Sequence, residues 1–194
     1  MKRLLWLAAI AGVALGADGP RVSFTKIFPG SDPAYVSIIV DKDGAVTYRE
    51  AKDEDPETFT LEADVSHAIF DLAEKLGHFK RPLESGLKVA RTGDKTFRWE
   101  NGAEASEAKF NYSLDENARL LQDWFERISE SERAMMNLRR AIRFDKLGVN
   151  DAVLRVDAAW SQKRLVGREQ FVPLLDRIAK NEGFVNLARE RQEG

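Results

Sequence analysis

The stretch that decides the fold is residues 35–48, Tyr-Val-Ser-Ile-Ile-Val-Asp-Lys-Asp-Gly-Ala-Val-Thr-Tyr. Apolar and polar residues alternate on both sides of Asp41-Lys42-Asp43-Gly44. An Asp-Gly pair between two alternating segments is a strong signal for a β-hairpin. We therefore predict paired antiparallel strands at Ala34–Val40 and Ala45–Glu50.

The alternating pattern extends outward from this hairpin, to Val22 and Phe24 before it and to Phe59 and Leu61 after it. Beyond Leu61 the apolar spacing becomes helical, with Asp64 as the expected N-cap and Gly77 as the stop. Three more strands are expected at Leu87–Arg91, Thr96–Glu100 and Ala108–Tyr112. The predicted fold class is α+β, an antiparallel β-meander with one packed helix.

From Ser113 onward the pattern is helical throughout. Ser113 with Glu116 and Ser129 with Glu132 each have the spacing of a capping box, which predicts two helix starts. Further helices are expected at Asp151–Leu165, Glu169–Asn181 and Val185–Arg191. We predict an α+β sheet domain at residues 17–114 and an all-helical C-terminal extension at residues 115–194. Whether the extension folds independently stays open.

Residues 1–16 have the pattern of a secretory signal peptide. A basic start, Met1-Lys2-Arg3, precedes an apolar run from Leu4 to Leu15, and Ala14 and Gly16 put small side chains at both positions that a signal peptidase must accommodate. A bilayer-spanning helix needs about 20 apolar residues, so we favour cleavage before Ala17 over an uncleaved anchor. We expect a periplasmic or secreted protein with no stable membrane anchor after cleavage.

The composition excludes several function classes. The 194 residues contain no cysteine, which removes disulfides, thiolate metal sites and cysteine nucleophiles. The 30 basic and 32 acidic residues nearly balance, so no nucleic-acid partner is expected. No nucleophile motif, phosphate-binding loop or His-Glu-x-x-His motif is present, and no cofactor is expected.

Two acidic segments are candidates for a cation site. Asp41 and Asp43 resemble the start of a calcium loop, and Glu50, Asp53 and Asp55 lie in an acidic run that extends to Glu57. Carboxylates that are close together repel one another and often bind a cation. A plain hairpin turn and a solvated loop are the alternative interpretations.

A basic cluster is the candidate for an anion or partner site. On a helical wheel Arg139, Arg143 and Lys146 lie on one side, next to an apolar stripe. They could bind an acidic partner, or simply border a buried stripe with their charged ends in water. The tryptophans of residues 17–194 are Trp99, Trp124 and Trp160, and each is expected in the core because it lies on a predicted element. A groove for sugars or peptides would need at least two of them exposed together.

The hairpin, followed by a helix that ends Leu76-Gly77-His78-Phe79, resembles exported bacterial domains of unknown function. The resemblance covers residues 21–128. It implies the fold and export, and no activity, because those domains have none established. The chain departs from them in lacking the cysteines that some members have before the first hairpin.

Together these observations predict an exported, non-catalytic binding or interaction module with an envelope protein as partner. One alternative is a small hydrolase in which His67 and carboxylates from Glu50 to Glu57 converge in the fold. A second alternative is a protein that binds a cation or small ligand through the acidic loop.

Overall fold

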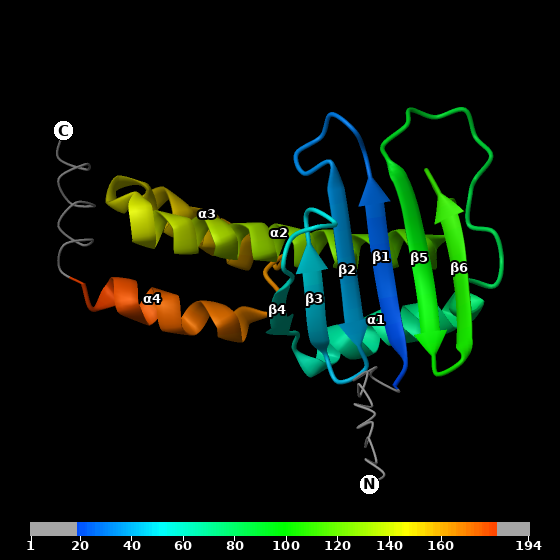
Figure 1. Ribbon diagram of the computed structural model, residues 1–194, viewed down its shortest axis with the longest axis horizontal. Helices are drawn as coiled ribbons and strands as arrows, with labels where there is room; N and C mark the ends of the chain where they lie inside the picture. Colours follow the sequence, from blue (N-terminus) through cyan, green and yellow to red (C-terminus); the bar gives the residue numbers. More distant parts are fainter. Residues whose placement is uncertain (1–18, 182–194) are drawn as a thin grey trace, which may run out of the picture.

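The structure, a computed structural model, describes residues 19–181. Residues 1–16 and the helix expected at Val185–Arg191 lie outside the described residues. The described chain is an α+β fold with a six-stranded antiparallel sheet and a helical region after it, which confirms the predicted fold class (Figure 1).

The sheet has the strand order β4-β3-β2-β1-β5-β6. The first four strands form a meander, and β5 then returns to pair with the free side of β1. The strands are β1 (Arg21–Ile27), β2 (Tyr35–Asp41), β3 (Ala45–Arg49), β4 (Glu57–Thr60), β5 (Asp94–Asn101) and β6 (Glu104–Phe110).

The predicted hairpin is the β2–β3 pair. Val40 lies opposite Val46, and the turn is closed by a hydrogen bond from the Gly44 N–H to the Asp41 carbonyl at 2.9 Å. Gly44 has a φ of +91°, and a Cβ there would lie 3.1 Å from the Leu61 carbonyl oxygen. Glycine therefore meets two requirements at this position. It adopts a positive φ without strain, and its lack of a Cβ allows close contact with the backbone of Leu61, just after β4.

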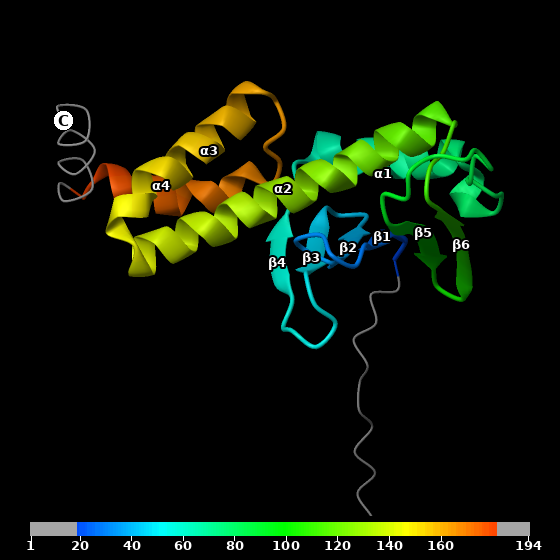
Figure 2. The same cartoon turned by 90° about the horizontal axis from the view of Figure 1, so that it is seen from above.

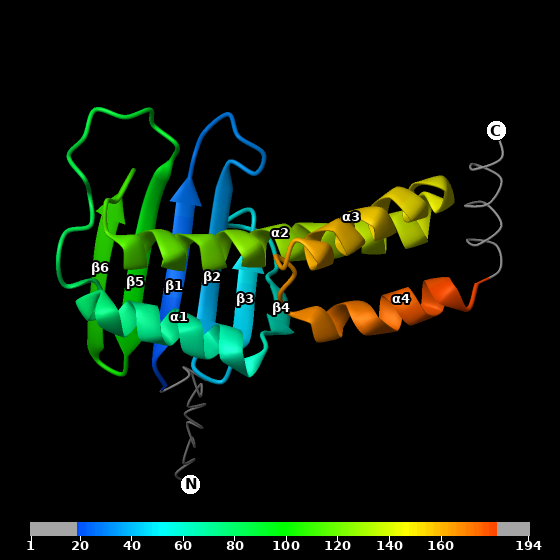
Figure 3. The ribbon, with the colours of Figure 1, turned by 180° about the vertical axis from the view of Figure 1, so that it is seen from behind.

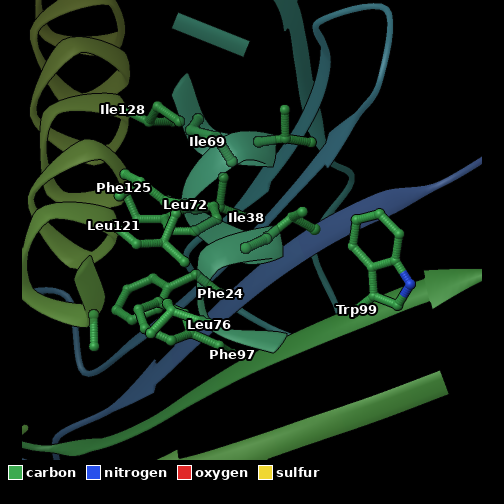
Figure 4. Packing of buried hydrophobic residues seen from close by; sticks show 14 of the residues in the cluster. Phe24, Ile38, Ile69, Leu72, Leu76, Phe97, Trp99, Leu121, Phe125 and Ile128 are labelled. Atoms are coloured by element: carbon green, nitrogen blue, oxygen red, sulfur yellow. The ribbon is translucent and has the colours of Figure 1, made fainter. Parts of the chain in front are cut away.

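Two helices cover one face of the sheet, α1 (Ala63–Lys75) and the first half of α2 (Glu116–Phe144), as Figures 2 and 3 show. Alternate strand residues point to this face and meet the apolar stripes of both helices. In the core Phe24 stacks on Phe125 with 5.2 Å between ring centroids (Figure 4). Of the described elements, none packs on the opposite face, which carries polar side chains such as Thr25, Thr47 and Arg98.

The prediction of a strand at Leu87–Arg91 is wrong. These residues belong to the connection between α1 and β5, outside regular structure. The connection is fixed by Asn111 just after β6, whose side chain accepts from the Thr92 N–H and donates to the Ala90 carbonyl. These bonds satisfy part of the backbone locally, without a strand ladder.

The helix starts in the structure also differ from the predicted ones. Asp64 lies inside α1, and Glu62 occupies the cap position without a capping hydrogen bond, because its carboxylate binds elsewhere. In α2 the cap is Asp115, which accepts from the N–H groups of Asn117 and Ala118. No helix starts at Ser129 and Glu132; α2 runs unbroken for 29 residues through them.

Beyond the sheet, α2 continues into an arm that it forms with α3 (Val149–Ser161) and α4 (Val172–Ala179) (Figures 1 and 2). Short 3₁₀ turns, η2 (Lys146–Gly148) and η3 (Arg168–Phe171), connect these helices. The arm has its own hydrophobic cluster, and α2 contributes to both clusters. The sheet cluster includes α2 residues up to Ile128, and the arm cluster begins at Met135, so the two clusters meet within α2, not at residues 114 and 115.

Candidate functional site

The five carboxylates of the predicted cation site are not brought together. Asp41 and Asp43 flank the β2–β3 turn, where Asp43 accepts from the Ala45 N–H at 3.1 Å. Glu50, Asp53 and Asp55 follow β3 at the opposite end of the sheet. Within residues 19–181, no group of three or more His, Asp or Glu side chains is arranged to hold a metal ion.

Glu50 has a different role in the fold. Its carboxylate accepts a hydrogen bond from the Tyr48 hydroxyl at 2.7 Å and lies 3.4 Å from Arg133 Nε on α2. The Tyr48 hydroxyl is also 3.2 Å from Ser129 Oγ. Burial raises the pKa of Tyr48, so this residue stays a neutral hydrogen-bonding group that connects the sheet to α2.

His67 does not meet the acidic loop. It is exposed on α1 and lines none of the four cavities described for the molecule. None of these cavities is lined by His67 or by residues 50–57, the set that the hydrolase hypothesis required.

The three basic residues of the predicted anion site differ in their ion pairs and in their positions. Arg139 lies 2.7 Å from Glu57 and 3.8 Å from the buried carboxylate of Glu132, so its charge is compensated. Arg143 and Lys146 are exposed at the far end of α2 and in the turn after it. Arg139 and Arg143 border the same hollow, and Lys146 does not line it, so an anion site formed by these residues stays a prediction.

The largest described hollow, of about 740 Å³, lies beside the connection that precedes β5. Its wall includes Lys95, whose ammonium donates to the Asn111 carbonyl and to Thr92 Oγ1. Burial, together with the nearby charge of Lys26, lowers the pKa of Lys95. These hydrogen bonds give Lys95 a structural role, because they tie the connection to the end of β6.

A second hollow, of about 580 Å³, lies between the start of α1, the middle of α2 and the chain that follows α3. We call it the tryptophan cleft, because Trp124 from α2 and Trp160 from α3 both line it. Its other lining residues are Glu62, Asp64, Val65, Arg127, Ser161, Lys163, Leu165, Val166 and Arg168. Figure 3 shows the chain after α3 passing beside β4 and the start of α1.

Each tryptophan of the cleft carries an arginine over its ring. The Arg127 guanidinium lies 4.5 Å from the centroid of Trp124, and the Arg168 guanidinium lies 5.4 Å from that of Trp160. Trp160 is 54% exposed, and Trp124 is half-buried. Such cation–π pairs are attractive and hold the long arginine side chains in place over the rings.

Glu62 positions one wall of the cleft. Its carboxylate accepts from the backbone N–H groups of Gly167 and Arg168 at 2.9 and 2.8 Å, and from Arg168 Nε at 2.7 Å. Burial opposes ionisation of Glu62, but these hydrogen bonds outweigh it and lower the pKa of the carboxyl. Gly167 has a φ of +62°, and a Cβ there would lie 2.9 Å from the Phe59 ring, so only glycine fits where the chain crosses β4.

Arg164 positions the other wall. Its guanidinium bonds to Glu130 at 2.6 Å and to Asp123 at 3.0 Å, and both carboxylates are on α2. The hydrogen bonds to Glu130 and Asp123 outweigh burial and raise the pKa of Arg164. Asp123 also pairs with Arg127 at 2.6 Å, so one network orients the arginine that covers Trp124.

The sequence predicted core positions for all three tryptophans, and this is correct for Trp99. Its ring is 9% exposed and stacks on His78 with 4.1 Å between centroids. Trp124 is half-buried against the sheet core and also lines the cleft, so the prediction is correct for it in part. Trp160 is exposed, and the return of residues 162–168 across α2 brings both tryptophans to one hollow. Spacing along a helix cannot show that return, since it depends on contacts between residues far apart in the chain.

The chain matches no protein-family model and no curated protein. The resemblance to exported bacterial domains therefore stays a prediction. Among residues 19–181, no helix has both the length and the apolar content needed to cross a bilayer.

Proposed function

We propose that this protein is an exported, non-catalytic binding module of the bacterial envelope that docks a partner protein in the tryptophan cleft. The observation that carries the proposal is the convergence of Trp124 and Trp160, each with an arginine over its ring, on one hollow. Tryptophan and arginine are the residues most enriched among those that dominate the energy of protein interfaces.

The cleft is well suited to binding because its walls are already ordered. Glu62 fixes the backbone at Gly167 and Arg168, and Arg164 joins the returning chain to α2. Side chains that are held before binding lose less conformational entropy when the partner arrives. A smaller share of the binding free energy is therefore lost in ordering these side chains.

The chemistry of the rim indicates what the partner presents. Asp64 contributes an exposed carboxylate to the lining of the cleft, and Lys163 an exposed ammonium. A matching segment would place an apolar or aromatic side chain between the tryptophans and charged groups of both signs around it. This mixed rim favours a protein segment over a ligand of one charge sign.

Export remains part of the proposal and rests on the leader pattern of residues 1–16. No observation on the described chain favours the alternative functions. His67 and the acidic loop lie apart, and the carboxylates proposed for a cation occupy opposite ends of the sheet.

The test is capture of the partner with tagged residues 17–194 in the native envelope fraction, with mild crosslinking and quantitative mass spectrometry. The informative variant is Trp160→Ala, and the matched control is Leu154→Ala, since Leu154 is 56% exposed on the same helix but does not line the cleft. The proposal expects one partner, competed by untagged protein, that is lost with Trp160→Ala and kept with Leu154→Ala. Equal capture by both variants would contradict it.

A further inference from the structure

The far end of the arm carries two large apolar side chains in an exposed position. Phe144, the last residue of α2, is 76% exposed, and Leu147 in the following turn is 57% exposed. We call the segment from Arg140 to Gly148 the arm tip; it lies away from the sheet, where α2 turns into α3 (Figures 1 and 2). Two large apolar side chains this exposed within four residues of one another form a candidate interaction surface.

The arm tip is also basic. Arg140, Arg143 and Lys146 are all exposed, against one acidic residue, Asp145. Part of the Asp145 carboxylate is used internally, because it accepts from the Gly148 N–H at 3.0 Å and so caps the turn. The Arg143 guanidinium lies 5.5 Å from the Phe144 ring centroid, which places positive charge directly beside apolar surface.

A hollow of about 400 Å³ adjoins the tip between α2 and α4. Its floor is apolar, from Ile142 and Leu174, and its rim carries Arg143 and Arg177 in addition to the paired Arg139. Within the described residues no ion pair occupies Arg143 or Arg177. Two guanidiniums above an apolar floor can hold a phosphate group while the floor contacts hydrocarbon.

From this arrangement we propose that the arm tip binds the surface of a membrane that contains anionic phospholipid. Phe144 and Leu147 enter the boundary between headgroups and acyl chains, and Arg143, Lys146 and Arg177 contact lipid phosphates. Apolar insertion and basic contacts act together in this kind of reversible surface binding, and neither alone is sufficient. The proposal is independent of the tryptophan cleft, which lies at the other end of α3.

The composition of the tip fits an anionic lipid surface. Phe144 ends α2, Leu147 and Lys146 lie in the turn η2, and Arg143 and Arg177 lie on α2 and α4. Apolar side chains together with cationic ones are typical of surfaces that bind anionic membranes reversibly. Residues 140–148 carry three basic side chains against one acidic one, Asp145, and this net positive charge complements an anionic lipid surface.

The experiment is co-sedimentation of purified residues 17–194 with vesicles of phosphatidylglycerol and phosphatidylcholine, compared with vesicles of phosphatidylcholine alone. The proposal expects binding to the anionic vesicles that weakens as salt is raised, because the basic contacts are screened. The double variant Phe144→Ala, Leu147→Ala should reduce the partition coefficient by about tenfold or more, since both side chains leave water on binding. Leu154→Ala, exposed on the same arm, should leave it unchanged.

Charge is tested with Arg143→Glu against Arg155→Glu, both exposed positions of the arm. Arg143→Glu should abolish binding, and Arg155→Glu should retain most of it. All these positions are exposed, so thermal melting curves should match the wild type and exclude misfolding as the cause. Binding that survives the Phe144 and Leu147 replacements, equal loss in both charge variants, competition by free inorganic phosphate, or no binding to anionic vesicles would each overturn the proposal.

Discussion

Replacing Glu132 by glutamine should stabilise the protein at neutral pH. Glu132 lies on α2 and is 0% exposed. Its Oε2 accepts from Gln170 Nε2 at 3.2 Å, whereas its Oε1 and the Gln170 Oε1 are both buried without a hydrogen-bond partner. A protonated carboxyl or an amide at position 132 can donate to the Gln170 oxygen, and a carboxylate cannot. The ionised form is therefore the one that fits this site worst.

The sign of the pH dependence follows from the pKa. Burial raises the pKa of Glu132, and Arg139 at 3.8 Å offsets this only in part because its closer partner is Glu57 at 2.7 Å. A carboxyl with a raised pKa binds its proton more tightly in the folded than in the unfolded protein. Its contribution to stability is present below the unfolded pKa and is lost as the pH rises through the folded pKa.

The expected gain for Glu132→Gln at pH 7 is about 1–2 kcal/mol, the range for relieving a buried unsatisfied polar group, less the attraction lost to Arg139. At about pH 4 the two proteins should differ by less than about 0.5 kcal/mol, because Glu132 is then protonated. Urea denaturation followed by circular dichroism at both pH values measures this difference. Glu74→Gln, exposed on α1, is the control and should show no such change. A less stable Glu132→Gln protein at neutral pH would refute the reasoning and show that the pair with Arg139 dominates.

Three further outcomes are expected. Gly44→Ala should lower the free energy of unfolding by about 1–3 kcal/mol in urea denaturation, because its φ of +91° strains a residue with a Cβ; an unchanged value would contradict the account of the turn. Millimolar calcium should leave the melting temperature unchanged, since the acidic segments are apart, and a rise that depends on calcium concentration would restore the cation hypothesis. Amino-terminal sequencing of protein from the envelope fraction should begin at Ala17, and a chain that still begins at Met1 would contradict cleavage.

Local patterns predicted the elements of the fold well. The Asp-Gly turn and alternating strands identify β2 and β3, and the spacing from Val65 to Leu76 identifies α1, because each signal is contained within a few neighbouring residues. The prediction of a helix start at Ser129 and Glu132 was wrong, because these side chains contact residues that are far away in the sequence. Ser129 contacts Tyr48 and Glu132 contacts Gln170, and a capping box cannot be told from such a pair by spacing alone.

The candidate sites were less predictable than the fold. Arg143 and Lys146 were recognised as an exposed basic group, yet the apolar pair beside them, Phe144 and Leu147, gave no signal that it would face water. The tryptophan cleft depends on the return of the chain after α3 and on the bonds from Glu62 to that chain. Contacts across about a hundred residues leave no periodicity in the sequence, so this site could be found only in the folded chain.

The most direct test of the tryptophan cleft is photo-crosslinking inside the native envelope. A photoreactive phenylalanine analogue would replace Ser161, an exposed residue that lines the cleft, and separately Leu154, which is exposed on the same helix outside it. The account predicts one discrete protein adduct from position 161 upon illumination, abolished by adding Trp160→Ala, and no such adduct from position 154. Absence of an adduct at position 161, or the same adduct from both positions, would contradict the cleft as the binding site.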